Sequence, residues 1–276
     1  MKGVVLLAQV SNSGTQYHDE SVRVPRNTKG RGSRGRRVVW VALWVIGALV
    51  LAALAMMVHS HKAPWPFELA FTKDIQGPHP VPCLVTQQPR SWLEAAFFDV
   101  SLLNNPIPSV IGGAILVGGM LLLRLWRQAI ALVLAVLSVG GLFLLLTPLV
   151  GRPRPTINYG ICVHDHYSYF SFPSGHVSHD VVIYGFLLYV TLSKPVRTWR
   201  YRWLLIPFQL LFIFDLLTIG YSRVLEGDHW LLDALGGYLT GALWLALAIF
   251  LYRLVLNWRA RRHQTDQQRK KMAVHS

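Results

Sequence analysis

The chain has 276 residues, of which 53% are hydrophobic and 14% are charged, and its formal net charge is +14. A single soluble core needs no such apolar excess, so the composition argues against a water-soluble domain and favours a helical membrane protein. The charge does not indicate a nucleic-acid partner, because the basic residues cluster beside apolar runs and no nucleic-acid-binding motif accompanies them. Membrane lipids, with anionic headgroups at the basic segments, are the expected partners.

Six apolar runs each approach the roughly 20 residues that a helix needs to cross the hydrocarbon core of a bilayer. They cover residues 38–58, 107–124, 128–149, 176–192, 203–221 and 231–252. We therefore predict an all-α polytopic membrane protein with six transmembrane helices in one bundle. Four clusters of glycine predict close contacts between these helices: Gly112-Gly113, Gly118-Gly119, Gly140-Gly141 and Gly237-x-x-x-Gly241.

The predicted domain organisation has three parts. Residues 1–37 form a disordered basic tail, residues 38–253 form the membrane domain, and residues 254–276 form a second basic tail. An outer loop, 59–106, joins the first two spans. Its amphipathic segment, 91–103, is interpreted as a helix at the membrane interface, with a lid or substrate guide as the alternative.

Lys and Arg are distributed unevenly about the spans. Twenty-one of the 27 lie in residues 1–37 and 253–276 and in the turns at 124–127 and 193–202. Because loops on the cytoplasmic side hold the excess of positive charge, we predict cytoplasmic termini in the plasma membrane. The other loops then face outward, and they contain both cysteines, Cys83 and Cys162. A disulfide and two free thiols are equally compatible with that location.

Three polar clusters stand at span ends on the predicted outer side. Residues 151–155, Gly-Arg-Pro-Arg-Pro, follow the third span. Residues 173–176, Pro-Ser-Gly-His, precede the fourth span, and residues 222–233 join the fifth to the sixth. The clusters are distant in sequence but level in the membrane, so we expect them to converge on one outward-facing site. Charged groups at a membrane boundary are typical of functional sites.

The residue types in these clusters suit a phosphate group. Arg154 and Arg223 offer planar guanidinium groups that match phosphate oxygens. Ser174 adds a hydroxyl, and the backbone amides around Gly175 begin a helix, where an anion is favoured. The clusters therefore predict a phosphate-binding site.

Two imidazoles accompany this predicted site. Asp233 follows His229 by four residues, so on a helix its carboxylate would hold one ring nitrogen and leave the other free. We predict that His229 is a nucleophile that forms a phosphohistidine, and that His176 acts as a general acid and then as a base. The scheme requires no metal and no cofactor. His179 gives His176 a metal-ligand spacing, but no further ligand cluster accompanies the two.

Together the clusters resemble the signature of the type 2 phosphatidic acid phosphatase superfamily. That signature has a Lys, six residues and Arg-Pro, then Pro-Ser-Gly-His, then Ser-Arg, five residues, His, three residues and Asp. The second and third parts match in full at residues 173–176 and 222–233. The first part matches at Arg154-Pro155, but Thr147 stands at the position of the Lys. The resemblance covers residues 107–252.

The resemblance implies a role for each matched residue. His229 is the phosphoryl acceptor, Asp233 is its partner and His176 is the acid and base. The implied phosphate ligands are Arg154, Ser174, Gly175 and Arg223. Thr147 can offer a hydrogen bond but no charge, so we expect Arg152 to supply the missing cation.

The expected function is that of a metal-independent integral membrane lipid phosphatase. Its substrate is a lipid phosphomonoester or the terminal phosphate of a lipid diphosphate, and similar bacterial proteins suggest undecaprenyl diphosphate, phosphatidylglycerophosphate or phosphatidic acid. The alternatives are a lipid-phosphate phosphotransferase that uses the same site and a non-catalytic lipid-binding protein, which only Thr147 favours. A transporter needs a polar path across the bilayer, and the cytoplasmic halves of these spans are apolar. The sequence indicates no oligomeric state.

Overall fold

A computed structural model describes residues 29–78, 91–103, 106–164 and 169–274. The chain divides into two compact units, Met1–Val41 and Ala42–Ser276. The boundary lies inside the first helix, α1 (Lys29–Ser60), and the site described below belongs to the second unit. Helices account for the regular structure of the described ranges, which contain no strand. This confirms the all-α prediction.

Each of the six predicted spans falls on a helix. These helices are α1, α4 (Pro106–Leu122), α5 (Trp126–Val150), α6 (Gly175–Leu192), α8 (Ile206–Leu225) and α9 (Leu231–Val274). Within the described residues, four segments are long and apolar enough to cross a membrane: Val38–Ser60, Trp126–Val150, Arg202–Leu225 and Leu231–Gln268. The apolar part of α4 is shorter, and α6 begins with polar residues. A total of six spans and the cytoplasmic termini therefore stay predictions.

Two helices lie in the described parts of residues 59–106, the predicted outer loop. α3 (Trp92–Leu103) coincides with the predicted amphipathic segment, whereas α2 (Pro66–Gln76) was not predicted. Pro66 at its first position and the contact from the Glu68 carboxylate to the Trp65 amide explain why α2 starts there. Cys162 is disulfide-bonded, and Cys83 lies outside the described residues.

Both predicted tails overlap helices. α1 already includes residues 29–37 of the first tail, whose residues 1–28 lie outside the described part of the chain. α9 continues as one helix to Val274, through most of the second tail. Short helical segments complete the loops: η1 (Ile157–Tyr159), α7 (Lys194–Arg197) and η2 (Arg202–Leu205).

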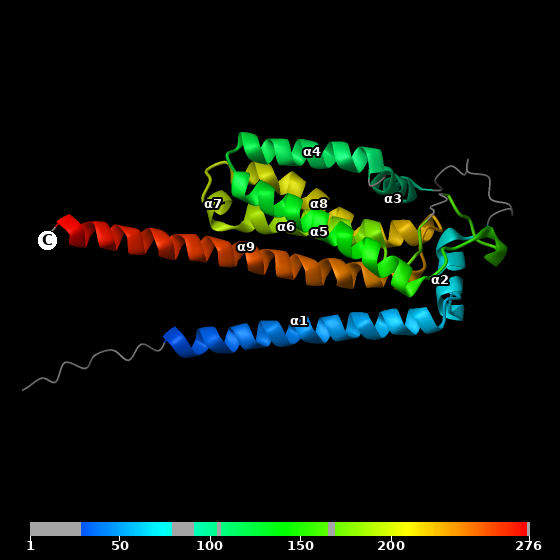
Figure 1. The fold of residues 1–276 in the computed structure, drawn as a ribbon. Helices are drawn as coiled ribbons and strands as arrows, with labels where there is room; N and C mark the ends of the chain where they lie inside the picture. The colour runs from blue at the N-terminus through cyan, green and yellow to red at the C-terminus, as the bar shows by residue number, and fades with distance from the viewer. Residues whose placement is uncertain (1–28, 79–90, 104–105, 165–168, 275–276) are drawn as a thin grey trace, which may run out of the picture. The chain divides into compact units, whose positions relative to one another are not determined.

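α6 is the central helix of the packing, with α5, α8 and α9 against it (Figure 1). The two predicted glycines of α9 allow this approach. A Cβ at Gly237 would lie 2.8 Å from the Ser174 carbonyl oxygen, and one at Gly241 would lie 2.7 Å from Cβ of Val181. The expected close contact between helices is confirmed at Gly237 and Gly241, and it places the start of α9 beside the start of α6. It is wrong for five of the other predicted glycines, where a Cβ would meet no neighbouring atom within 4 Å: Gly112, Gly113, Gly118, Gly119 and Gly141.

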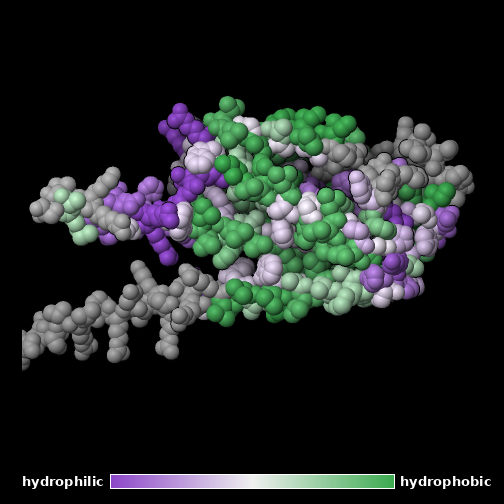
Figure 2. All heavy atoms as spheres, in the orientation of Figure 1, coloured by the Kyte–Doolittle hydropathy of each residue, from purple (hydrophilic) through white to green (hydrophobic). Residues whose placement is uncertain are grey.

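The face of the helices seen in Figure 2 is largely apolar between their ends. Figure 2 shows hydrophobic residues over the sides of the helices, with hydrophilic residues gathered towards their ends. Leu134, Leu137 and Leu144 of α5 are each more than half exposed. A surface of this kind suits a lipid environment, because lipid tails are as apolar as these side chains.

Candidate active site

The three polar clusters lie at one end of the helices, beside α2 (Figure 1). The first follows the end of α5, where Gly151 adopts the left-handed conformation with a φ of 63°. The second begins α6, and the third runs from the last turn of α8 to the start of α9. Ser171, two residues before the second cluster, donates its backbone N–H to the Arg152 carbonyl, and Ser174 donates its own to the Asp233 carbonyl. Backbone hydrogen bonds therefore connect residues 171–174 to the first and third clusters.

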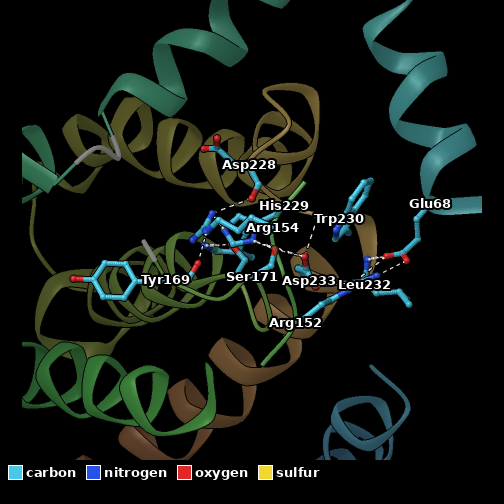
Figure 3. Close-up of polar contacts among 12 residues, drawn as sticks. Glu68, Arg152, Arg154, Tyr169, Ser171, Asp228, His229, Trp230, Leu232 and Asp233 are labelled. Atoms are coloured by element: carbon cyan, nitrogen blue, oxygen red, sulfur yellow. Dashed lines mark hydrogen bonds and ion pairs between the residues drawn. The ribbon is translucent and has the colours of Figure 1, made fainter. Parts of the chain in front are cut away.

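His229 lies at the centre of the site and is fully buried (Figure 3). Its Nε2 is 3.4 Å from Nη1 of Arg154, and its ring centroid is 6.4 Å from that of His176. The two imidazoles and the guanidinium group come from three separate stretches of the chain. The expected convergence on one site is therefore present in the structure.

Asp233 reaches His229 through a third residue that the sequence analysis did not identify. Its Oδ2 lies 3.9 Å from Nδ1 of His229, too far for a hydrogen bond. The Ser171 hydroxyl lies between them, donating to Oδ2 of Asp233 at 2.5 Å and lying 3.2 Å from Nδ1 of His229. Direct contact at helical spacing was expected, but α9 begins only at Leu231, so His229 precedes the helix.

This arrangement selects one tautomer of His229. The single hydroxyl proton of Ser171 is directed to Asp233, so Ser171 can only accept from His229, and Nδ1 must carry the proton. In a neutral ring, Nε2 then has a lone pair, and it is the nitrogen that faces Arg154. In this tautomer, the nitrogen of His229 that lies beside the Arg154 guanidinium carries no proton.

The surroundings of His229 also keep its ring neutral. Burial lowers the pKa of His229 well below its ordinary value, and the charges of Arg154, His176 and Arg223 lower it further. The ring is therefore neutral at neutral pH.

The two arginines expected to bind phosphate are both held by neighbouring groups. Arg154 donates from Nε to the Tyr169 carbonyl and from Nη1 to the Asp228 carbonyl, each at 2.9 Å. Arg223 is fully buried and pairs with the carboxylates of Asp228 at 3.0 Å and Glu226 at 3.2 Å. Its Nε has no hydrogen-bond partner among the described residues. A rigid guanidinium with a donor to spare is suited to an incoming anion.

The start of α6 is the third expected phosphate contact. Ser174 is the N-cap, and its hydroxyl oxygen accepts a hydrogen bond from the Val177 amide at 3.5 Å. The hydroxyl proton is not used in this contact. A Cβ on Gly175 would lie 2.8 Å from the Phe143 ring, which leaves no room for a larger residue. The N-terminus of a helix is also a position where an anion is favoured.

Neither Thr147 nor Arg152 takes the expected position at the phosphate site. The Thr147 hydroxyl donates to the Phe143 carbonyl within α5. Arg152 is fully buried, and its guanidinium donates to Glu68 at 2.6 Å and to Asp233 at 2.7 Å. Burial alone lowers the pKa of Arg152, but the charges and hydrogen bonds of Asp233 and Glu68 outweigh it and raise the pKa above its ordinary value. The geometry thus favours a supporting role for Arg152, directed at Asp233.

The described residues contain no group of three or more His, Cys, Asp or Glu side chains arranged to hold a metal ion. His179, whose spacing from His176 raised that alternative, has its Nδ1 2.8 Å from the Gly175 carbonyl oxygen. Its ring is thus engaged within α6.

Comparison with known proteins agrees with this geometry. Residues 110–259, more than half of the chain, match the PAP2 superfamily. A crystal structure of the first transmembrane PAP2 type phosphatidylglycerolphosphate phosphatase from Bacillus subtilis is similar in fold. It has a TM-score of 0.61 at 22% identity, over 77% of this chain and 96% of that one. Aquifex aeolicus LpxE matches with a TM-score of 0.49 at 20% identity, over 67% of this chain and 96% of that one. A comparison with curated proteins gave no match. The chain belongs to the PAP2 superfamily and has the fold of its membrane lipid phosphatases.

Proposed function

We propose that this protein is a membrane lipid phosphatase that works through a phosphohistidine at His229. One observation carries the proposal: Nε2 of His229 lies 3.4 Å from Nη1 of Arg154, while Nδ1 is held through Ser171 by Asp233. A neutral imidazole fixed in this tautomer is a competent nucleophile towards phosphorus. The cations around it suit the charge of the phosphoryl oxygens.

In the first step, Nε2 of His229 attacks the phosphorus atom while His176 is in its protonated, imidazolium form. A P–N bond forms while the P–O bond to the lipid leaving group breaks, and that oxygen takes a proton from the imidazolium, which leaves His176 neutral. In the second step, a water molecule gives a proton to His176 as its oxygen attacks phosphorus. The P–N bond breaks, inorganic phosphate leaves, and both histidines return to their starting states.

The remaining motif residues would hold the phosphoryl oxygens. They are Arg154, whose Nη1 is 3.4 Å from Nε2 of His229, the first-turn amides at Gly175, and Arg223, whose Nε has no hydrogen-bond partner among the described residues. Ser174 stabilises the start of α6 as its N-cap and adds a hydroxyl beside those amides. Thr147 adds no charge, so the positive charge at the site comes from the two arginines.

The substrate is a phosphomonoester or the terminal phosphate of a diphosphate on a lipid, at the outer face of the plasma membrane. The exposed apolar sides of the helices would let the lipid tail stay in the bilayer while its headgroup reaches the site. The solved relative from Bacillus subtilis is described as a phosphatidylglycerolphosphate phosphatase. Phosphatidic acid, phosphatidylglycerophosphate and undecaprenyl diphosphate are therefore the substrates to compare.

The test is phosphate release by the purified protein, in micelles, from these three lipids and from glycerol phosphate as a control without a lipid tail. We expect at least one lipid to turn over and glycerol phosphate to react far more slowly. EDTA should leave the rate unchanged, because no step uses a metal. If no lipid is hydrolysed, or if EDTA abolishes a rate that divalent ions restore, the proposal fails. Adding glycerol distinguishes phosphotransfer, since an acceptor that competes with water yields glycerol phosphate in place of inorganic phosphate.

A further inference from the structure

α2 carries a polar stripe that is buried against the site. Glu68, Thr72 and Gln76 recur at intervals of four residues, so they share one face of the helix, and none is more than 4% exposed. α2 lies outside residues 110–259, the range that matches the family. Burying a carboxylate and a carboxamide is costly unless each finds partners. The partners of Glu68 connect this helix to His229.

The Glu68 carboxylate accepts four hydrogen bonds (Figure 3). Its Oε2 accepts from Nη2 of Arg152 at 2.6 Å and from the Trp65 amide at 3.0 Å. Its Oε1 accepts from Nη1 of Arg152 at 3.2 Å and from the Leu232 amide at 3.0 Å. Glu68 therefore fixes both Arg152 and the first turn of α9, directly beside Asp233.

From Arg152 the contacts continue to the reacting nitrogen. Nη1 of Arg152 donates to Oδ1 of Asp233 at 2.7 Å, which leaves Oδ2 for Ser171 and the Trp230 amide. Ser171 in turn holds Nδ1 of His229. We propose that Glu68 is a positioning residue for the reaction: through Arg152 it orients Asp233, and through Asp233 and Ser171 it fixes the ring of His229. This inference rests on the proposed function.

The other end of α2 is anchored independently of Glu68. The Gln76 carboxamide accepts from the Cys162 amide and donates to the Cys162 and Leu225 carbonyls, each at 2.9 Å. These contacts join α2 to the loop before α6 and to the last residue of α8. A conservative change at Glu68 therefore leaves α2 attached, and its effect can be measured on a folded protein.

Glu68→Gln is the informative change because it preserves shape and alters acceptor capacity. A carboxamide has one acceptor oxygen, and its NH2 group would be directed at donors that now bind the second carboxylate oxygen. Arg152 would lose one of its two anionic partners and its fixed orientation. Loss of a hydrogen-bond partner that orients a site residue usually lowers activity by about 10- to 100-fold. We therefore expect kcat of E68Q to fall by that factor. KM should stay within about threefold, because Glu68 does not touch the substrate.

The experiment compares phosphate release by the wild type, E68Q, D233N and the double variant E68Q/D233N, with D74N as a control on the exposed side of the same helix. If Glu68 acts through Asp233, E68Q lowers kcat in the wild type but changes it less than about threefold in the D233N background. Equal losses in both backgrounds, a changed KM, or an E68Q enzyme as active as D74N would overturn the inference.

The melting temperature and a second variant distinguish a folding defect from a loss of positioning. Glu68→Asp keeps the charge and both acceptor oxygens but withdraws them by one methylene, so we expect a smaller loss of kcat than in E68Q. An E68D enzyme with the full kcat of D74N would overturn the positioning role even if E68Q does not fold. A wild type that hydrolyses no lipid phosphate would instead overturn the proposed function, so the two failures are distinct.

Discussion

The hydroxyl of Ser171 distinguishes this site from a simple pair of histidine and aspartate. Its 2.5 Å contact with Asp233 and its 3.2 Å contact with His229 connect two side chains that are 3.9 Å apart. Asp233 is occupied on all sides, because Oδ1 accepts from Arg152 and Oδ2 accepts from Ser171 and the Trp230 amide. A fully satisfied buried carboxylate of this kind is fixed in place, and so is the ring it supports.

The titration of His229 follows from its surroundings. Burial and the nearby charges of Arg154, His176 and Arg223 lower its pKa, so the ring should take up a proton only below the ordinary histidine value of about 6.5. The neutral form of the ring therefore persists as the pH falls through 6.5 and is lost at lower pH. NMR of histidine-labelled protein in micelles, with the His229 signal assigned by its loss in His229→Gln, measures this directly. A midpoint at or above 6.5 would contradict the assignment.

The sequence predicted the site residues that belong to a motif with fixed spacing. Arg154, His176 and His229 were expected to converge, and they do. Arg152 was expected at the phosphate because it is the nearest cation to Thr147. Its guanidinium instead pairs with Glu68, 84 positions away, which no local pattern indicates. Ser171 and Glu68 were missed for the same reason, although Ser171 stands only three residues before Ser174.

Among the elements, the long apolar helices were predictable and α2 was not. The hydropathy runs located the six major helices because each is apolar over most of its length. α2 has 11 residues, and its buried face consists of Glu68, Thr72 and Gln76. Hydropathy assigns such a face to solvent, so the burial of α2 follows only from the tertiary hydrogen bonds that satisfy it.

The approach of α9 to α6 gives a prediction at this scale. A Cβ on Gly237 would lie 2.8 Å from the Ser174 carbonyl oxygen and 2.9 Å from Cβ of Val177. Gly237→Ala should therefore push the start of α6 away and destabilise the protein by about 1–3 kcal/mol, the usual range for overpacking. Loss of melting temperature and of phosphatase activity together would show the effect.

Gly112→Ala in α4 is the matched control for this change. Gly112 is also helical, but a Cβ at this position would meet no neighbouring atom within 4 Å, so alanine should be neutral or stabilise the helix by up to about 1 kcal/mol. Equal melting temperatures for the two variants would mean that the close approach of α9 to α6 does not matter for folding.

The whole molecule combines apolar helices with a polar site at one end. The apolar sides of the helices suit the bilayer, and one polar end gathers two imidazoles, two arginines and a helix start from remote stretches of the chain. Membership of the PAP2 superfamily agrees with both features. The distribution of Lys and Arg predicts that this end faces outward, opposite to the basic tails.

Replacing the proposed nucleophile is the sharpest test of the phosphohistidine mechanism. Phosphate release from the best lipid substrate should be measured for wild type and His229→Gln, purified side by side and matched in melting temperature. Because the variant lacks the nitrogen that accepts the phosphoryl group, we expect a loss of kcat of at least about 1000-fold. A folded variant that keeps more than about a tenth of the wild-type rate would contradict the mechanism, since the reaction would then proceed without His229.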